Sequence, residues 1–236
     1  MSTLLTEIRQ GWRAIWQQPA SAALIIALLA LGLACVIAIA SIIKTTMIDP
    51  LPFPAADRLH RIGWIDPLQP TDGPEDLQGA EFLQWQTALQ DTAELAAAQD
   101  GTVNLATGDA VTRFDGAFVS ANLFAMLQLT PMLGRDFRPE DDRPGAPLVV
   151  MLSEAVWRTR FAADPEVIGR TLRANGEAAT IVGVMPRDFT FPLHENVWLP
   201  ARLDANATPA SDRELAVFLS LPPQTALDAV LMPLQR

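Results

Sequence analysis

The sequence predicts an α+β fold, in which one apolar N-terminal helix precedes a mixed domain of strands and short helices. An uncharged run of about 24 residues, from Ala20 to Ile43, occurs only once. At 1.5 Å per residue it would extend roughly 36 Å as a helix, enough to cross a bilayer. The rest of the chain alternates short apolar runs with amphipathic segments of helix length. Asn175-Gly176 joins two such runs, as in a tight β-hairpin.

These patterns divide the chain into three parts. Residues 1–18 are expected to form an interfacial elbow helix, because their apolar residues, including Trp12 and Trp16, recur at helical spacing. Residues 19–46 form the predicted transmembrane helix, with Pro19 at the bend. Residues 47–236 form the predicted extracytoplasmic domain, in two small lobes. Arg9 and Arg13 before the span favour a cytoplasmic N-terminus, which places the domain across the membrane.

A cleaved signal peptide is the alternative interpretation of the apolar run. Ala38-Ile39-Ala40 before Ser41 has the small-x-small pattern of a cleavage site. The run is longer than a signal-peptide core and continues through Ile43, which favours an uncleaved anchor. A lipoprotein signal ending at Cys35 fits less well, because Gly32 lies where a branched apolar residue is expected.

The domain reads as short elements separated by turn-rich loops at residues 49–54, 67–79 and 205–212. Ser153 would cap a helix that begins at Glu154, because its hydroxyl can accept a free backbone N–H of the first turn. The other expected elements, in order, are a strand over Arg58–Ile65, a helix over Ala80–Gln90, extended segments over Ala93–Gln99, Val103–Ala106 and Ala110–Val119, a short helix over Asn122–Leu127, a strand over Leu148–Leu152, a hairpin over Gly169–Val184, strands over Val197–Leu199 and Leu215–Leu221, and a helix over Thr225–Leu231.

Composition excludes several classes of function. The formal net charge is −10, from 17 basic and 27 acidic residues, so the chain lacks the basic surface of a nucleic-acid-binding protein. Its one cysteine, Cys35, lies in the apolar run and rules out an intrachain disulfide and a cysteine metal site.

The sequence shows no catalytic constellation. His60 and His194 are the only histidines, and neither belongs to a ligand-spaced motif. Ser153 lacks the flanking glycines of a nucleophile elbow. The acidic run Glu140-Asp141-Asp142, with Asp136 nearby, does not match a calcium loop and is interpreted as a solvated turn. No phosphate-binding loop is present. We therefore predict no catalytic, cofactor-binding or metal-binding residues, and a protein that is not an enzyme.

A series of motifs runs from Ala117 to about Leu203. The recognisable pieces are Val119-Ser120 to Phe124, Leu133-Gly134-Arg135-Asp136-Phe137, Val150 to Phe161, Val167 to Leu172, Asn175-Gly176, Ile181 to Pro186, and Phe189. In this order and spacing they resemble the MacB-like periplasmic core domain of FtsX/MacB-type ABC transporter permeases. Leu51-Pro52-Phe53-Pro54 and the elbow helix extend the resemblance. The motif residues are interpreted as architectural: Gly134 and Gly183 permit close packing, and Trp157 and Phe161 share a helical face.

The resemblance implies a function in transport. Permeases of this family have three further membrane helices after the domain, and the sequence ends before them, so it reads as a permease truncated after the domain. We expect a non-catalytic single-pass subunit in the bacterial inner membrane, without cofactors, whose domain contacts an ABC permease, an ATPase subunit, a periplasmic adaptor or cargo. The lipid bilayer would be its other partner, and a homo-oligomer is compatible with this role. The alternatives are a free-standing interaction or sensor module and a truncated permease without independent function.

Overall fold

The computed structural model describes residues 19–43, 58–64, 74–108, 110–187, 189–192, 194–207, 213–221 and 230. It separates the chain into two compact units, Met1–Leu51 and Pro52–Arg236. In the first unit, helix α2 runs over Pro19–Ile43, where the sequence predicts the apolar helix. Over the residues described, the structure contains no helix recognised as long and apolar enough to cross a membrane. The elbow helix predicted over residues 1–18 lies outside the described residues.

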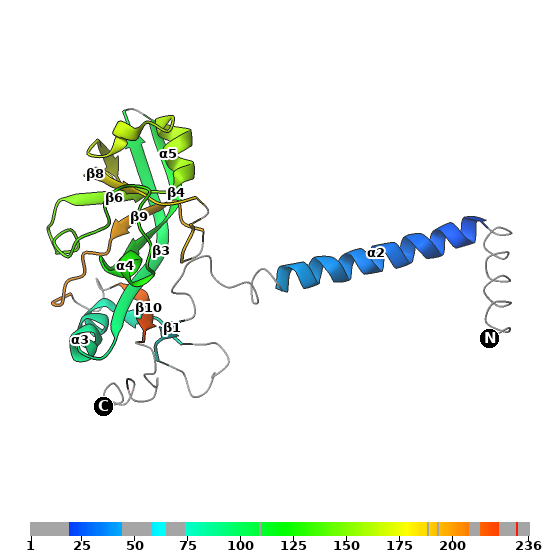
Figure 1. Cartoon of the computed structure of the whole chain (residues 1–236), viewed down its shortest axis with the longest axis horizontal. Helices are drawn as coiled ribbons and strands as arrows, with labels where there is room; N and C mark the ends of the chain where they lie inside the picture. The colour runs from blue at the N-terminus through cyan, green and yellow to red at the C-terminus, as the bar shows by residue number, and fades with distance from the viewer. Residues whose placement is uncertain are drawn as a thin grey trace. The chain divides into compact units, whose positions relative to one another are not determined.

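The second unit is a mixed sheet with helices packed on it (Figure 1). Its longest strands are β3 (Glu94–Thr107) and β4 (Ala110–Val119), which pair antiparallel over their shared length. The other elements are β1 (Leu59–Ile62), β2 (Leu77–Gln78), α3 (Gly79–Leu89), α4 (Leu123–Met126), β5 (Leu133–Gly134), β6 (Leu148–Leu152), α5 (Glu154–Phe161), the 3₁₀ turn η3 (Pro165–Val167), β7 (Thr171–Ala174), β8 (Glu177–Val184), β9 (Val197–Pro200) and β10 (Glu214–Ser220).

The sheet runs in the order β1-β10-β3-β4-β9-β6-β8-β5. The pairs β4–β9 and β6–β8 are parallel and the rest are antiparallel. Strand β7 pairs with β8 and also returns to β3, where Leu105 lies opposite Ala174. The pairings β3–β4–β9–β6–β8–β7–β3 therefore close a ring, which removes free strand edges from this part of the domain.

Alternating side chains divide the interior into three hydrophobic clusters. On β6, Val149 and Met151 face the central cluster, whereas Val150 and Leu152 face the ring cluster beside α5. Strand β3 alternates in the same way between the central cluster and a third cluster under α3. Figure 1 shows α3 and α5 at opposite ends of the β3–β4 ribbon. The central cluster thus joins the two ends of the β3–β4 ribbon.

The expectation of two small lobes takes a different form in the structure. Residues 52–236 make one compact unit, because β3 contributes side chains to all three clusters and runs through both ends. For the same reason, the two extended segments predicted at Ala93–Gln99 and Val103–Ala106 are one continuous strand.

Most of the local predictions are confirmed. Strand β4 and strand β6 have the predicted bounds, and α3 differs by one residue at each end. Asn175 and Gly176 form the β7–β8 turn with φ of 50° and 86°, as a primed hairpin turn requires. The final helix predicted over Thr225–Leu231 lies outside the described residues except for Val230, which is buried in the cluster under α3.

Candidate functional site

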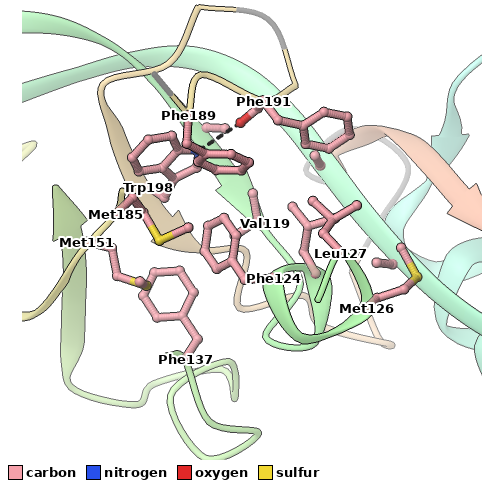
Figure 2. Close-up of a cluster of buried hydrophobic side chains, with 14 of the residues drawn as sticks. Val119, Phe124, Met126, Leu127, Phe137, Met151, Met185, Phe189, Phe191 and Trp198 are labelled. Atoms are coloured by element: carbon pink, nitrogen blue, oxygen red, sulfur yellow. Dashed lines mark hydrogen bonds between the residues drawn. The ribbon is translucent and has the colours of Figure 1, made fainter. Parts of the chain in front are cut away.

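Several residues of the predicted motifs, including Phe124, Phe137 and Phe189, lie in the central cluster. Phe124 of α4 lies with its ring centroid 5.9 Å from that of Phe137, 5.7 Å from that of Phe189 and 6.0 Å from that of Trp198 (Figure 2). The indole N–H of Trp198 donates to the Phe191 carbonyl at 2.9 Å. Since these rings are buried against one another, the motifs that carry them build the core rather than a ligand site.

Two motif glycines allow close backbone packing. Gly134 has a φ of +78°, and a Cβ there would clash with the carbonyl oxygen of Val182. A Cβ at Gly183 would lie 2.6 Å from the carbonyl oxygen of Arg135. Both residues sit where β5 pairs with β8, so the predicted architectural role of these glycines agrees with the structure.

Ser153 is a helix cap. Its hydroxyl accepts the N–H of Val156 at 3.2 Å, which satisfies a free donor of the first turn of α5. Trp157 and Phe161 of α5 both pack against the ring cluster, as predicted. His60 lies exposed on β1 and His194 lies exposed in the loop before β9. Within the described ranges, no three His, Cys, Asp or Glu side chains gather as metal ligands would.

The acidic run Glu140-Asp141-Asp142 is not the solvated turn that the sequence predicted. Arg135 donates to both carboxylate oxygens of Asp141, at 2.6 and 3.1 Å. Asp142 accepts the backbone N–H of Ala121 on Oδ2 at 3.0 Å and that of Arg202 on Oδ1 at 2.6 Å. Glu140 alone of the run is exposed. The turn is therefore a brace that connects the start of α4 to the segment after β9.

The electrostatics of this brace follow from burial. Burial raises the pKa of Asp136 to about 6, against the opposing effect of the Phe137 N–H that its Oδ1 accepts at 2.7 Å. Burial also raises the pKa of Asp142, although the N–H groups of Arg202 and Ala121 favour the charged form. The pKa of Asp141 is lowered, because the Arg135 guanidinium and the Arg138 N–H outweigh its burial.

Arg202 also contributes to this brace, and the sequence did not predict that role. Its side chain donates to Glu177 through two nitrogens, at 3.0 and 2.8 Å, and to the Ala146 carbonyl at 2.8 Å. It adopts a left-handed φ of 49°, unusual for a non-glycine residue. A single arginine in a loop-rich stretch carries no local signal of such a role.

The brace borders a groove of about 530 Å³, which we call the junction groove. Its walls are formed by α3, by residues around the start of α4, by the acidic turn and by the segment after β9. The lining residues are Phe82, Leu83, Gln86, Ser120, Ala121, Asn122, Ala125, Phe137, Pro139, Asp142 and Leu203. Phe82 belongs to the cluster under α3 and Phe137 to the central cluster, so the groove lies where the two meet. Its size is that of a typical binding site. Two further grooves, both polar, lie beside Gln90 and beside Arg202, with volumes of about 450 and 430 Å³.

Together, the aromatic core and the groove beside it belong to one α+β domain. The whole of residues 22–236 matches the model of the MacB-like periplasmic core domain, and the chain belongs to this family. The resemblance predicted from the motifs is thereby confirmed. A search of curated proteins finds no match.

Three solved structures share the fold at low sequence identity. The periplasmic region of MacB from Actinobacillus actinomycetemcomitans matches with a TM-score of 0.54 and 14% identity, over 75% of this chain and 79% of that one. The extracellular domain of the noncanonical ABC-type transporter YknZ from Gram-positive bacteria matches with a TM-score of 0.53 and 11% identity, over 73% and 88%. A domain of a putative permease from Porphyromonas gingivalis gives 0.51 and 17%, over 78% and 85%.

Proposed function

We propose that this protein is a non-catalytic, membrane-anchored component of a MacB/FtsX-type ABC transport system. Its domain would lie on the extracytoplasmic side of the bacterial inner membrane and contact a permease, an adaptor or cargo. The observation that carries this proposal is the extent of the family match. It begins at residue 22, within α2, and continues through the domain to residue 236, so the apolar helix and the domain belong to one family unit.

The proposed anchor is the apolar helix α2, with the N-terminus in the cytoplasm. No charged residue occurs between Pro19 and Ile43. The described large apolar side chains of the helix, from Leu24 to Ile39, are more than half exposed in the structure. Burial of this much apolar surface in a bilayer would be strongly favourable, at about 25 cal/mol per Å².

The domain is suited to transmit force or to present a binding surface to a partner. Its strands close a ring around one cluster, and β3 links that ring to the cluster under α3. A closed and interlocked sheet resists local unfolding. Movement of an attached helix would therefore displace the domain as a unit, with any ATP hydrolysis supplied by a partner.

Affinity purification of the tagged full chain from native membranes tests the proposal. The matched control is a tagged anchor that ends at residue 57. An ABC permease, ATPase or adaptor should be enriched at least tenfold with the full chain over the control. Recovery of no component of an ABC system with the full chain would refute the proposal. Extraction of the full chain by alkaline carbonate would refute the anchor separately.

A further inference from the structure

The junction groove has an apolar interior. Phe82, Leu83, Phe137, Pro139 and Leu203 line it, and the exposed Ala125 lies at its border. Its polar side chains are largely engaged within the domain. Asn122 donates to the Leu95 carbonyl at 2.8 Å, and the Ser120 hydroxyl accepts the Ala97 N–H at 2.9 Å. A guest that needs many hydrogen bonds, such as a sugar or nucleotide, would find few free partners there.

The groove has a negative charge. Of the described residues that line it, Asp142 is the one with a charged side chain. Among the described residues no ion pair includes Asp142. Two arginines of the surrounding segments pair elsewhere, since Arg135 pairs with Asp141 and Arg202 pairs with Glu177. The half-buried carboxylate of Asp142 is balanced by backbone N–H groups alone.

The surroundings extend this charge. Residues 74–101, which include α3, contain six acidic residues and no lysine or arginine. On the brace side, residues 135–143 contain four acidic residues and three arginines, of which Arg135 pairs with Asp141 and Arg138 and Arg143 are exposed. A positively charged guest would gain chiefly from the α3 side and from Asp142, and a negatively charged one would be repelled there.

We propose that the junction groove binds a segment of a partner protein that presents an apolar side chain next to a lysine or arginine. The apolar side chain would fill the space between Leu83 and Phe137, and the cation would approach Asp142. The inference deepens the proposed function and rests on it, because that function requires a protein partner on this side of the membrane. Charge complementarity and the apolar lining select the class of segment.

The test uses the full chain in detergent micelles and three fluorescent twelve-residue peptides. Each has a Phe-Leu centre, flanked by lysines, by glutamates or by serines, and binding is followed by anisotropy. The lysine peptide should bind at least tenfold more tightly than the glutamate peptide, and the difference should shrink at high salt.

Three variants at one exposed position locate the site. Ala125→Trp fills the groove and should weaken binding of the lysine peptide at least tenfold. Ala125→Lys should weaken it similarly, whereas Ala125→Glu should preserve or strengthen it. Because Ala125 also borders the neighbouring polar groove, Gln90→Trp, which lines only that neighbour, is the control and should leave binding unchanged.

Several results would overturn the inference. These are equal binding of all three peptides, no effect of Ala125→Trp, or loss of binding in Gln90→Trp as well. Binding of dodecylamine at the groove, without binding of any peptide, would assign it to a small amphipathic cation instead. Self-association that Ala125→Trp abolishes would assign it to a second copy. In each case the co-purification experiment would still report independently on the proposed function.

Discussion

The carboxylate of Asp142 accepts the backbone N–H of Arg202 at 2.6 Å, across 60 residues of sequence. With its second bond, to Ala121, this carboxylate ties together the acidic turn, the start of α4 and the segment after β9. The turn that borders the junction groove is thus fixed by a half-buried acid.

Asp142→Ala should destabilise the domain by about 2–4 kcal/mol, because it leaves two part-buried N–H donors without their acceptor. For a domain of this size the melting temperature would fall by roughly 5–10 °C. Thermal unfolding of the full chain, followed by tryptophan fluorescence, measures the change. Glu140→Ala, two residues away and exposed, should shift it by less than about 2 °C. Equal shifts for the two variants would rule out the brace.

Acid should stabilise the domain through Asp136. The pKa of Asp136 is about 6 in the folded state, above the ordinary value of 3.8. The folded protein therefore binds a proton more tightly than the unfolded chain, and stability is lost as pH rises from about 4 to about 6.

Asp136→Asn removes this titration while retaining an acceptor for the Phe137 N–H. The variant should be more stable than the wild type at pH 7.5, by at most about 3 kcal/mol and by less where solvent screens the carboxylate. The two proteins should be nearly equal at pH 4. The difference in melting temperature between them, measured from pH 4 to 8, checks the prediction. A variant that loses stability at pH 7.5 would contradict it.

Gly134→Ala should be far more costly than Gly145→Ala. Both glycines have nearly the same backbone, with φ of +78° and +77°. A Cβ at Gly134 meets Val182 and Ile168, whereas a Cβ at Gly145 meets nothing within 4 Å. Gly145→Ala should cost about 1 kcal/mol from the backbone alone. Gly134→Ala should cost at least about 2 kcal/mol more. Similar melting temperatures for the two variants would argue against tight β5–β8 packing.

Phe124→Ala should cost about 3–5 kcal/mol, because it opens a cavity among three other aromatic rings. Phe114→Ala, at a half-buried ring on β4, is the comparison and should cost clearly less. Chemical denaturation of the full chain gives both values. A smaller loss of unfolding free energy for Phe124→Ala than for Phe114→Ala would contradict the role of the central cluster as the core.

Sequence predicted the elements that depend on neighbouring residues. The Asn175-Gly176 turn and the Ser153 cap are local, and their residues suffice to specify them. The family motifs likewise included several residues of the central cluster, among them Phe124, Phe137 and Phe189, but neither Trp198 nor Phe191.

Local sequence patterns could not predict the long-range features of the fold. Return of β7 to β3 joins Leu105 to Ala174, and no pattern within either strand specifies that pairing. The acidic run has three similar carboxylates, and nothing in their order distinguishes the half-buried Asp142 from the exposed Glu140. The junction groove arises only when α3 and the brace are brought together by the sheet.

Photo-crosslinking in intact native cells tests the central claim most directly. A photo-reactive amino acid in place of Ala125 would sample whatever occupies the junction groove, and the same residue in place of Gln90 would serve as the control. We predict an adduct at position 125, absent at position 90, that mass spectrometry identifies as an ABC permease, an ATPase-associated subunit or an adaptor. Adducts at position 125 that contain no component of an ABC transport system would contradict it.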